Sequence, residues 1–440
     1  MKEHLVLVGN GMAGMRTLEE LLSIAPDRYD ITVFGAEPYG NYNRILLSPV
    51  LAGEKTVEQI MINDLNWYAE RGITLHAGKE VTRINRARRQ VHAADETIAP
   101  YDRLLLATGS DPFIIPVPGN TLPGVITFRD IRDVQAMLDA AQAGKKQAVV
   151  IGGGLLGLEA ANGLMKQGME VTVVHLLDVL MERQLDPEAA ALLRASLEER
   201  GMRFLTGAQT VALLGEERVR GVRFKDGLEI PADLVVMAVG IRPNIGLAKT
   251  FGIHCERGIV VNDTMQTYDP RIYAVGECVA HRGIAYGLVA PLFEQAKVCA
   301  NHLANFGIAR YTGSVTSTKL KVTGIDLFSA GNFMGGPGTD EIVLNDAAGG
   351  VYKKLVVKND TLVGAVLYGD TADGGWYFQL VKDGQNIREL RDQLLFGQNH
   401  VGDGGHAGVS KAASMPDEAE VCGCNGVCKG DIVKAIKEKG

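Results

Sequence analysis

Two glycine-rich stretches have the spacing of nucleotide-binding turns. "HLVLVGNGMAGMRTLEELL" (4–22) and "QAVVIGGGLLGLEAANGLM" (147–165) each join an apolar run typical of a strand to a G-x-G-x-x-G and then to apolar residues at helical spacing. A single copy is weak evidence, because a tight turn can need glycine for steric reasons alone. Two copies in the same context indicate two dinucleotide sites. Their glycines are Gly9, Gly11 and Gly14 in the first copy and Gly152, Gly154 and Gly157 in the second.

An acidic residue follows the second strand of the first copy only. "YDITVFGAE" (29–37) ends in Glu37, which is placed to accept hydrogen bonds from a ribose; the alternative is a solvated loop carboxylate. "MEVTVVH" (169–175) ends instead in His175, which could face a 2′-phosphate or simply end the strand. Asp178 could replace the missing acid, and Arg183 could bind a phosphate. The choice between NADH and NADPH therefore stays open, with NADH favoured.

Three later segments have the form of a strand that ends at a glycine. They are "YDRLLLATGSDP" (101–112), "PADLVVMAVGIRPN" (231–244) and "TYDPRIYAVGECV" (267–279), and the last precedes a segment with helical spacing of apolar residues. The residues at these strand ends are Ala107, Thr108, Gly109, Gly240, Gly276 and Glu277.

In this order, the segments resemble the two-dinucleotide-binding-domain flavoprotein reductases, in which the chain leaves the FAD domain, forms the NAD(P) domain and returns. The resemblance implies an α/β fold with two Rossmann-like domains of the glutathione-reductase type and a small α+β C-terminal domain. The expected boundaries are 1–115 and 246–310 for the FAD domain, 116–245 for the NAD(P) domain, 311–400 for the C-terminal domain, 401–420 for a linker and 421–440 for a cysteine segment.

The resemblance also implies roles for single residues. Glu37 would bind the FAD ribose, and Glu277 stands where the family usually has Asp for the ribityl and phosphate portion; alternatively, Glu277 caps the following helix. That helix, beginning near Pro291, would direct its N–H groups at the flavin and stabilise the reduced ring. The implied dinucleotide-binding residues are Gly9, Gly11, Met12, Ala13, Gly14, Glu37, Ala107, Thr108, Gly109, Gly152, Gly154, Leu155, Gly157, Glu159, Gly240, Gly276 and Glu277.

Disulfide reductases of this architecture carry C-x-x-x-x-C beside the flavin, but the first cysteine here is Cys255. The corresponding segment, "EPYGNYNRILLSPVLAGEK" (37–55), resembles that of reductases that pass electrons to iron–sulfur proteins or rubredoxins. In it, Arg44 is a candidate for the adenylate side of FAD, and the alternative is a surface ion pair.

Glu159 follows the second glycine turn, and the resemblance brings it to the nicotinamide–flavin junction as the candidate catalytic residue. Related ferredoxin reductases often have Lys directly after the equivalent of Ser48, which is itself expected in the cofactor site. Pro49 stands there, so Lys55 or no lysine pairs with Glu159. The implied reaction is hydride transfer from nicotinamide C4 to flavin N5, which requires no protein general base.

Three of the six cysteines lie in "VCGCNGVCKGDIVKAI" (421–436). Iron–sulfur clusters are ordinarily held by four cysteines, and zinc also accepts thiolates. The segment resembles the start of the 2Fe–2S ferredoxin-like domain in the large subunit of assimilatory NAD(P)H nitrite reductase, with Cys422 and Cys424 as its first ligand pair. Because the second pair does not follow, we expect a shortened chain, ligands from a second chain, or free thiols.

The resemblance implies an FAD-dependent oxidoreductase that takes hydride from NADH or NADPH and passes electrons to an iron–sulfur or sirohaem centre, as the reductase part of nitrite reductase. The first alternative is an electron-transfer subunit of assimilatory nitrate reductase, or a reductase for another ferredoxin- or rubredoxin-like carrier. An alternative from another class is a nucleotide-sensing redox regulator. The C-terminal domain would cover the flavin cleft and could form a homodimer.

The composition agrees with a globular protein: 46% of the residues are hydrophobic and the net charge is −7. No stripe of Lys and Arg predicts nucleic-acid binding, and no apolar run reaches the length of a membrane span. The N-terminus enters a strand without a leader sequence, and the cysteines before Cys422 are scattered. We therefore expect a cytoplasmic protein.

Overall fold

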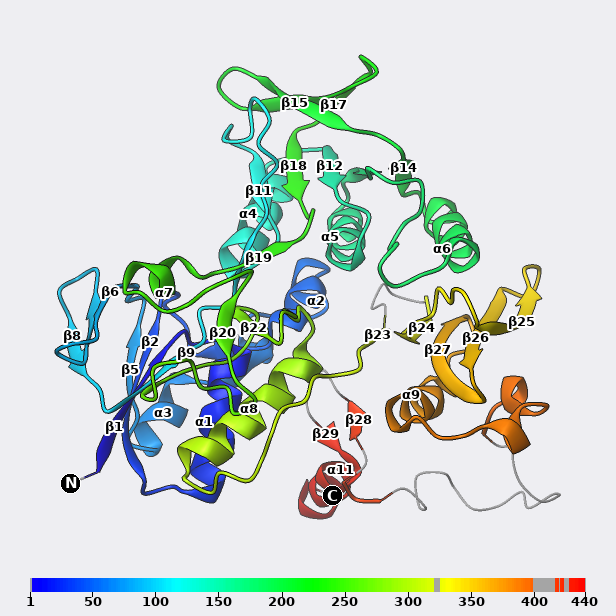
Figure 1. Cartoon of the computed structure of the whole chain (residues 1–440). Coiled ribbons are helices and arrows are strands. Elements are labelled where there is room, and N and C mark those ends of the chain that lie inside the picture. The colour runs from blue at the N-terminus through cyan, green and yellow to red at the C-terminus, as the bar shows by residue number, and fades with distance from the viewer. Residues whose placement is uncertain (1, 320–324, 399–415, 419, 423–426, 440) are drawn as a thin grey trace.

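The structure is a computed structural model that describes residues 2–319, 325–398, 416–418, 420–422 and 427–439. A parallel five-stranded sheet in the order β21-β9-β1-β2-β5 lies at the left of Figure 1. Its central strand is buried on both faces, as the uninterrupted apolar run predicts for a parallel sheet. Helices α1 and α8 pack against each other beside it. The bounds are β1 (Glu3–Val8), β2 (Tyr29–Gly35), β5 (Thr74–Ala77), β9 (Arg103–Leu106), β21 (Ile272–Ala274), α1 (Met12–Ile24) and α8 (Val289–Leu303).

A second parallel five-stranded sheet repeats this plan in the order β11-β18-β12-β13-β14. Strand β12 takes the place of β1, and α5 follows its glycine turn as α1 follows the first. The internal sequence repeat is therefore a repeat of structure, which confirms the predicted fold class. The bounds are β11 (Val125–Thr127), β12 (Gln147–Ile151), β13 (Glu170–Val174), β14 (Arg203–Leu205), β18 (Leu234–Met237), α4 (Ile131–Gln142), α5 (Leu155–Lys166) and α6 (Pro187–Glu199).

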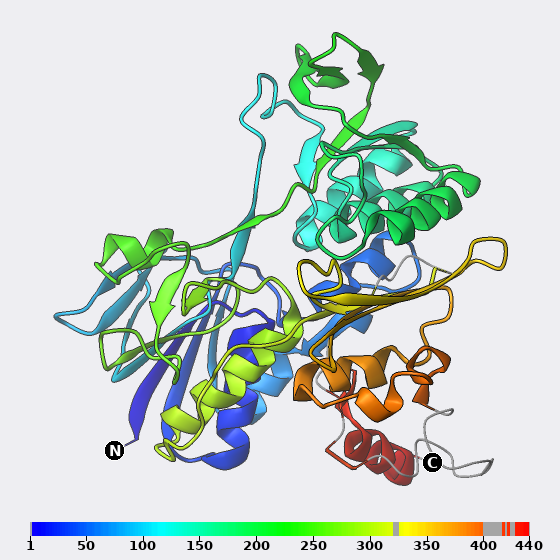
Figure 2. The same cartoon turned by 45° about the vertical axis from the view of Figure 1, so that its right-hand side comes forward.

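The chain crosses between the two sheets through an antiparallel ribbon of β10 (Ser110–Pro112) and β19 (Ile241–Pro243). Each half also carries a three-stranded antiparallel sheet. Figure 2 shows the second half above the first, with the ribbon between them. The small sheets and the parallel pair β20/β22 comprise β6 (Val81–Asn85), β7 (Gln90–Ala93), β8 (Ile98–Pro100), β15 (Thr210–Gly215), β16 (Val219–Phe224), β17 (Glu229–Pro231), β20 (Ile259–Val261) and β22 (Val279–His281).

An antiparallel sheet in the order β23-β24-β27-β26-β25 forms the C-terminal unit, with α9 on one face. It packs on the second half, where the Tyr352 hydroxyl donates to Asp186 Oδ2 at 2.6 Å. Asp186 also accepts from the Ala189 N–H at 3.1 Å and so caps α6. The bounds are β23 (Ser317–Lys319), β24 (Leu327–Gly331), β25 (Asp340–Asp346), β26 (Val351–Lys358), β27 (Thr361–Tyr368) and α9 (Gly374–Asp383).

Shorter elements complete the described chain. None of the described helices has the length and apolar character needed to cross a membrane. The remaining bounds are β3 (Asn41–Tyr42), η1 (Arg44–Leu46), α2 (Leu47–Leu51), η2 (Glu58–Ile60), β4 (Met61–Asn63), α3 (Leu65–Glu70), α7 (Gly246–Thr250), η3 (Arg388–Leu390), η4 (Leu394–Phe396), β28 (Glu420–Cys422), β29 (Val427–Cys428) and α11 (Lys429–Lys439).

Candidate dinucleotide-binding site

The first glycine of each turn is required by the backbone. Gly9 has φ +108° and Gly152 has φ +123°, a region that other residues rarely adopt. A Cβ on Gly9 would overlap the carbonyl oxygen of Ala107, and one on Gly152 would overlap that of Ala238. The two turns therefore have the same steric requirement at equivalent places.

The third glycine of each turn lets the helix approach its strand. A Cβ on Gly14 would lie 2.9 Å from the Ala107 Cβ and 3.0 Å from the Gly9 carbonyl oxygen. A Cβ on Gly157 would overlap the Gly152 carbonyl oxygen. These positions are closed by protein atoms, so their glycines serve packing.

The middle glycines differ, because they face open space. Apart from the adjoining residues of the chain, no described atom lies within 4 Å of a Cβ built on Gly11 or on Gly154, although both backbones have ordinary φ values of −87° and −83°. Neither α1 nor α5 has a side-chain cap among the described residues. The first N–H groups of both helices can therefore receive a phosphate, which fits a dinucleotide in each turn.

The strand end at Gly276 lies next to the first glycine turn. Gly276 lies beside α1, since its Cβ would be 3.0 Å from the Ala13 Cβ. Its N–H donates to Gln295 Oε1 of α8 at 2.9 Å, and Gln295 is 1% exposed. Helix α8 begins at Val289, close to the predicted Pro291, and likewise has no side-chain cap within the described residues. The middle of α8 is thereby tied to the strand end that lies beside the start of α1.

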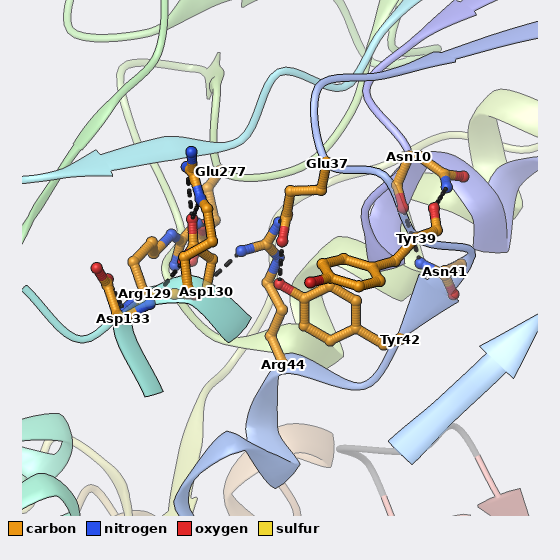
Figure 3. A network of polar contacts seen from close by, with 11 residues as sticks. Asn10, Glu37, Tyr39, Asn41, Tyr42, Arg44, Arg129, Asp130, Asp133 and Glu277 are labelled. Atoms are coloured by element: carbon orange, nitrogen blue, oxygen red, sulfur yellow. Dashed lines mark hydrogen bonds and ion pairs between the residues drawn. The ribbon is translucent and has the colours of Figure 1, made fainter. Parts of the chain in front are cut away.

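Glu37 and Arg44 form a half-buried ion pair, shown in Figure 3. The Tyr42 hydroxyl donates to the other carboxylate oxygen of Glu37 at 2.7 Å, and burial raises the pKa of Tyr42. Burial lowers the pKa of Arg44, but the neighbouring Tyr42 and Glu37 outweigh it, so the net shift is upward. Arg44 also donates to the Arg129 carbonyl oxygen at 3.0 Å. Arg44 thus forms an ion pair, the alternative to an FAD contact, but the pair is half-buried rather than at the surface. Its partner is the predicted ribose acceptor, and the contact of Arg44 with FAD stays a prediction.

Glu277, also labelled in Figure 3, does not cap α8, the helix that follows it. It accepts from the Ser110 hydroxyl at 2.8 Å and pairs with Arg129 of the second half. Asp133, whose pKa is raised by burial, accepts from the Arg129 backbone N–H at 2.7 Å. Sequence reasoning missed Arg129, although an arginine between a strand and a helix in "TFRDIRD" was a visible signal.

The predicted Thr108 and Gly109 lie where the two halves cross. The Thr108 hydroxyl donates to the Asn244 carbonyl oxygen at 2.6 Å, and the Asn244 N–H donates to the Gly109 carbonyl oxygen at 2.9 Å. The Gly240 carbonyl oxygen accepts from the Phe113 N–H at 2.9 Å. The residues that follow β9 in the first half are therefore hydrogen-bonded to the residues that follow β18 in the second half.

Glu159 connects α5 to α2. Its carboxylate accepts from the Ser48 hydroxyl at 2.7 Å, and Glu159 is only 6% exposed. Lys55 lies at an exposed position beyond α2. The Gln167 side chain donates to the Leu51 carbonyl oxygen at 2.7 Å, so α5 and α2 are joined at a second point. A buried carboxylate thus lies between the second glycine turn and the segment after Arg44.

The cysteine segment is described only in part. Cys422 ends β28, its side chain is not described, and Cys424 lies outside the described residues. The Cys428 thiol lies 3.1 Å from Asp431 Oδ2 at the start of α11. No group of three or more potential metal ligands occurs among the described residues. Both predicted cluster ligands remain predictions.

Comparison with known proteins identifies relatives for the whole chain. Residues 3–302 match the pyridine nucleotide-disulphide oxidoreductase family, and residues 317–385 match the rubredoxin NAD+ reductase C-terminal domain. The chain is 52% identical over 439 residues to the NAD(P)H nitrite reductase of Bacillus subtilis (strain 168), covering 100% of this chain and 54% of that protein. It is 44% identical over 435 residues to the assimilatory nitrate reductase electron transfer subunit of the same organism, covering 99% and 55%.

A solved structure supports the same architecture. The covalent putidaredoxin reductase–putidaredoxin complex matches with a TM-score of 0.80 and 29% identity, covering 91% of this chain and 96% of that one. The chain spans about half the length of the two Bacillus relatives. From its paired glycine turns and the family match over residues 3–302, the chain belongs to the pyridine nucleotide-disulphide oxidoreductase family.

Proposed function

We propose that this chain is an FAD-dependent oxidoreductase that oxidises NAD(P)H and forms the reductase part of an assimilatory nitrite reductase, which converts nitrite to ammonia. The observation that carries the proposal is the steric equivalence of the two glycine turns, because each has an open middle glycine at an uncapped helix start. The 52% identity to a nitrite reductase supports the acceptor.

The residues around the first turn bind and orient the flavin cofactor in this proposal. Gly11 admits its pyrophosphate to the start of α1, and Glu37 accepts from its ribose. Glu277 and Arg129, which belong to different halves, bind its central portion. The uncapped start of α8 provides a partial positive charge for the reduced ring. When bound, FAD accepts a hydride and releases electrons singly.

Ser48 and Glu159 hold the junction between the two dinucleotides. Their hydrogen bond closes the space between α2 and α5, and the burial of Glu159 indicates that water is largely excluded there. Water exclusion and fixed orientation favour hydride transfer between stacked rings. Glu159 acts as an orienting group in this proposal, since hydride transfer needs no protein base.

Electrons leave without an internal thiol relay. The first cysteine in the sequence is Cys255, so the segment 37–55, which contains α2, has no thiol that could relay electrons. Cys278 and Cys299 are buried, and burial raises the pKa of both thiols. An external iron–sulfur or sirohaem centre is therefore the acceptor we propose, with Cys422 and Cys424 contributing to a 2Fe–2S site. A cytoplasmic location and a homodimer are further parts of the proposal.

Steady-state assays of the FAD-loaded chain test this division of labour. We expect rapid NAD(P)H-dependent reduction of an artificial electron acceptor without consumption of nitrite, because the chain spans about half of the nitrite reductase relative. Nitrite consumption by the isolated chain would refute the division, and failure to retain FAD would refute the proposal itself.

The 44% identity to a nitrate reductase electron transfer subunit supports a second candidate, in which the acceptor is an assimilatory nitrate reductase. Both candidates require the same flavin chemistry. Rapid mixing of the reduced chain with each purified acceptor separates them, because only the physiological acceptor should accelerate flavin reoxidation.

A further inference from the structure

The turn after β13 shows how the second site can select its dinucleotide. NAD-binding sites usually place a carboxylate at this strand end, where it accepts from the ribose 2′-hydroxyl. His175 stands there instead, followed by the exposed side chains of Leu176 and Leu177, which are 62% and 46% exposed. The exposed Asp178 and Arg183 are the nearby charges that sequence reasoning considered.

Both ring nitrogens of His175 are engaged within the protein. Nδ1 accepts from the Gly153 N–H at 3.1 Å, which puts the proton of the neutral ring on Nε2. Nε2 lies 3.2 Å from Glu182 Oε2, to which it donates. His175 therefore has no free N–H for a 2′-phosphate, and its 11% exposure leaves little room for one to approach.

The backbone of Gly153 forms hydrogen bonds to both ends of this turn, at His175 and at Met181. Its N–H donates to His175, while its carbonyl oxygen accepts from the Met181 N–H at 3.0 Å. Met181, which directly precedes Glu182, has φ +51°, a left-handed conformation that turns the chain. Gly153 itself adjoins Gly154, the open glycine of the second turn. The Glu182 carboxylate is thus fixed relative to the place proposed for the pyrophosphate.

We infer that Glu182, positioned by His175, is the specificity-determining carboxylate of the second site: it accepts from the ribose 2′-hydroxyl of NADH and repels the 2′-phosphate of NADPH. This inference rests on the proposed function, because it assigns the preferred dinucleotide of that site. Asp178 lacks the link to Gly153 that His175 and Met181 give to Glu182. The carboxylate of Glu182 also opposes recruitment of a phosphate by its neighbour Arg183.

Calorimetric binding of NAD+ and NADP+ to the FAD-loaded chain tests the inference without turnover. We expect NAD+ to bind at least about 10-fold more tightly than NADP+, because a fixed carboxylate repels a phosphate dianion. Glu182→Gln should reduce that ratio by about 10-fold, mainly through tighter NADP+ binding. His175→Ala should act in the same direction. Added salt should reduce the preference in the wild type, because charge repulsion is screened.

Matched variants separate Glu182 from the other charges. Glu199→Gln removes one exposed carboxylate at the C-terminal end of α6, away from the turn after β13, and should leave the ratio unchanged. FAD content and denaturant unfolding monitor folding in every variant. A wild type without a preference for NAD+, a ratio that changes in Asp178→Asn but not in Glu182→Gln, or NADP+ binding that depends on Arg183 would overturn the inference. Binding of neither dinucleotide would overturn the proposed function as well.

Discussion

The open middle glycines predict a selective pair of alanine variants. Gly11 and Gly154 have φ values that alanine adopts readily and empty space at the Cβ position. An added methyl group should cost folding only about 1 kcal/mol, because alanine is a poorer N-cap residue than glycine. The same methyl group enters the space proposed for a pyrophosphate. We therefore expect loss of one ligand with a retained fold.

The size of the effect follows from the steric overlap. Forcing an extra methyl into a fitted contact typically costs about 1–3 kcal/mol, which corresponds to roughly 5- to 150-fold weaker binding. Gly11→Ala should weaken FAD by this factor and leave the second turn intact. Gly154→Ala should retain FAD and weaken NADH instead. Gly9→Ala serves as the contrast, because its φ of +108° and the overlap with Ala107 should destabilise the fold itself.

Two titrations measure these effects. FAD added to the stripped chain is followed by quenching of flavin fluorescence, and NADH binding is followed on the FAD-loaded chain under anaerobic conditions. Denaturant unfolding reports the free energy of unfolding of each variant. The reasoning fails if Gly11→Ala binds FAD normally, or if both alanine variants weaken the same ligand.

Three further predictions follow from single contacts. Ser48→Ala should slow NADH-dependent flavin reduction by about 10-fold at unchanged FAD content, because Glu159 loses an orienting donor; stopped-flow absorbance measures this, and a loss of FAD with a normal rate would argue against it. Glu277→Gln should weaken FAD by about 10-fold through loss of a charge-assisted pair, measured by fluorescence, whereas unchanged affinity would contradict its role. Asp263→Asn should remove a pH dependence of the free energy of unfolding. Arg282, together with His281, lowers the Asp263 pKa from 3.8 to about 2, so the ionised form stabilises the fold above pH 3.8 and this contribution disappears as the pH falls toward about 2. Denaturant titrations over that range should show the wild-type advantage shrinking, and a constant difference would exclude the pair.

Local patterns allowed the repeated core to be predicted from the sequence. The apolar runs ending at Gly9 and Gly152 form buried parallel strands. They could be predicted because a strand that is covered on both faces has apolar residues without alternation. The start of α8 was predicted within two residues of Val289. The proposed domain boundaries stay predictions.

The polar contacts of the site could not be predicted in the same way. Arg129 and Glu277 are 148 positions apart, and only the return of the chain through the ribbon brings them together. The link from His175 to Glu182 depends on the reversal of the chain at Met181, which the residue types alone do not indicate. Short-range spacing pointed to Glu37 as a candidate. That Tyr42 and Arg44 contact its carboxylate could be seen only in the folded structure.

The central claim is that the two glycine turns hold two different dinucleotides, with the flavin at the first and the nicotinamide at the second. Anaerobic addition of NADH to the purified, FAD-loaded chain tests it most directly. The visible absorbance of the oxidised flavin should disappear with one equivalent of NADH per flavin. A chain that takes up no FAD, or whose bound flavin keeps its colour with NADH and NADPH alike, would contradict the claim.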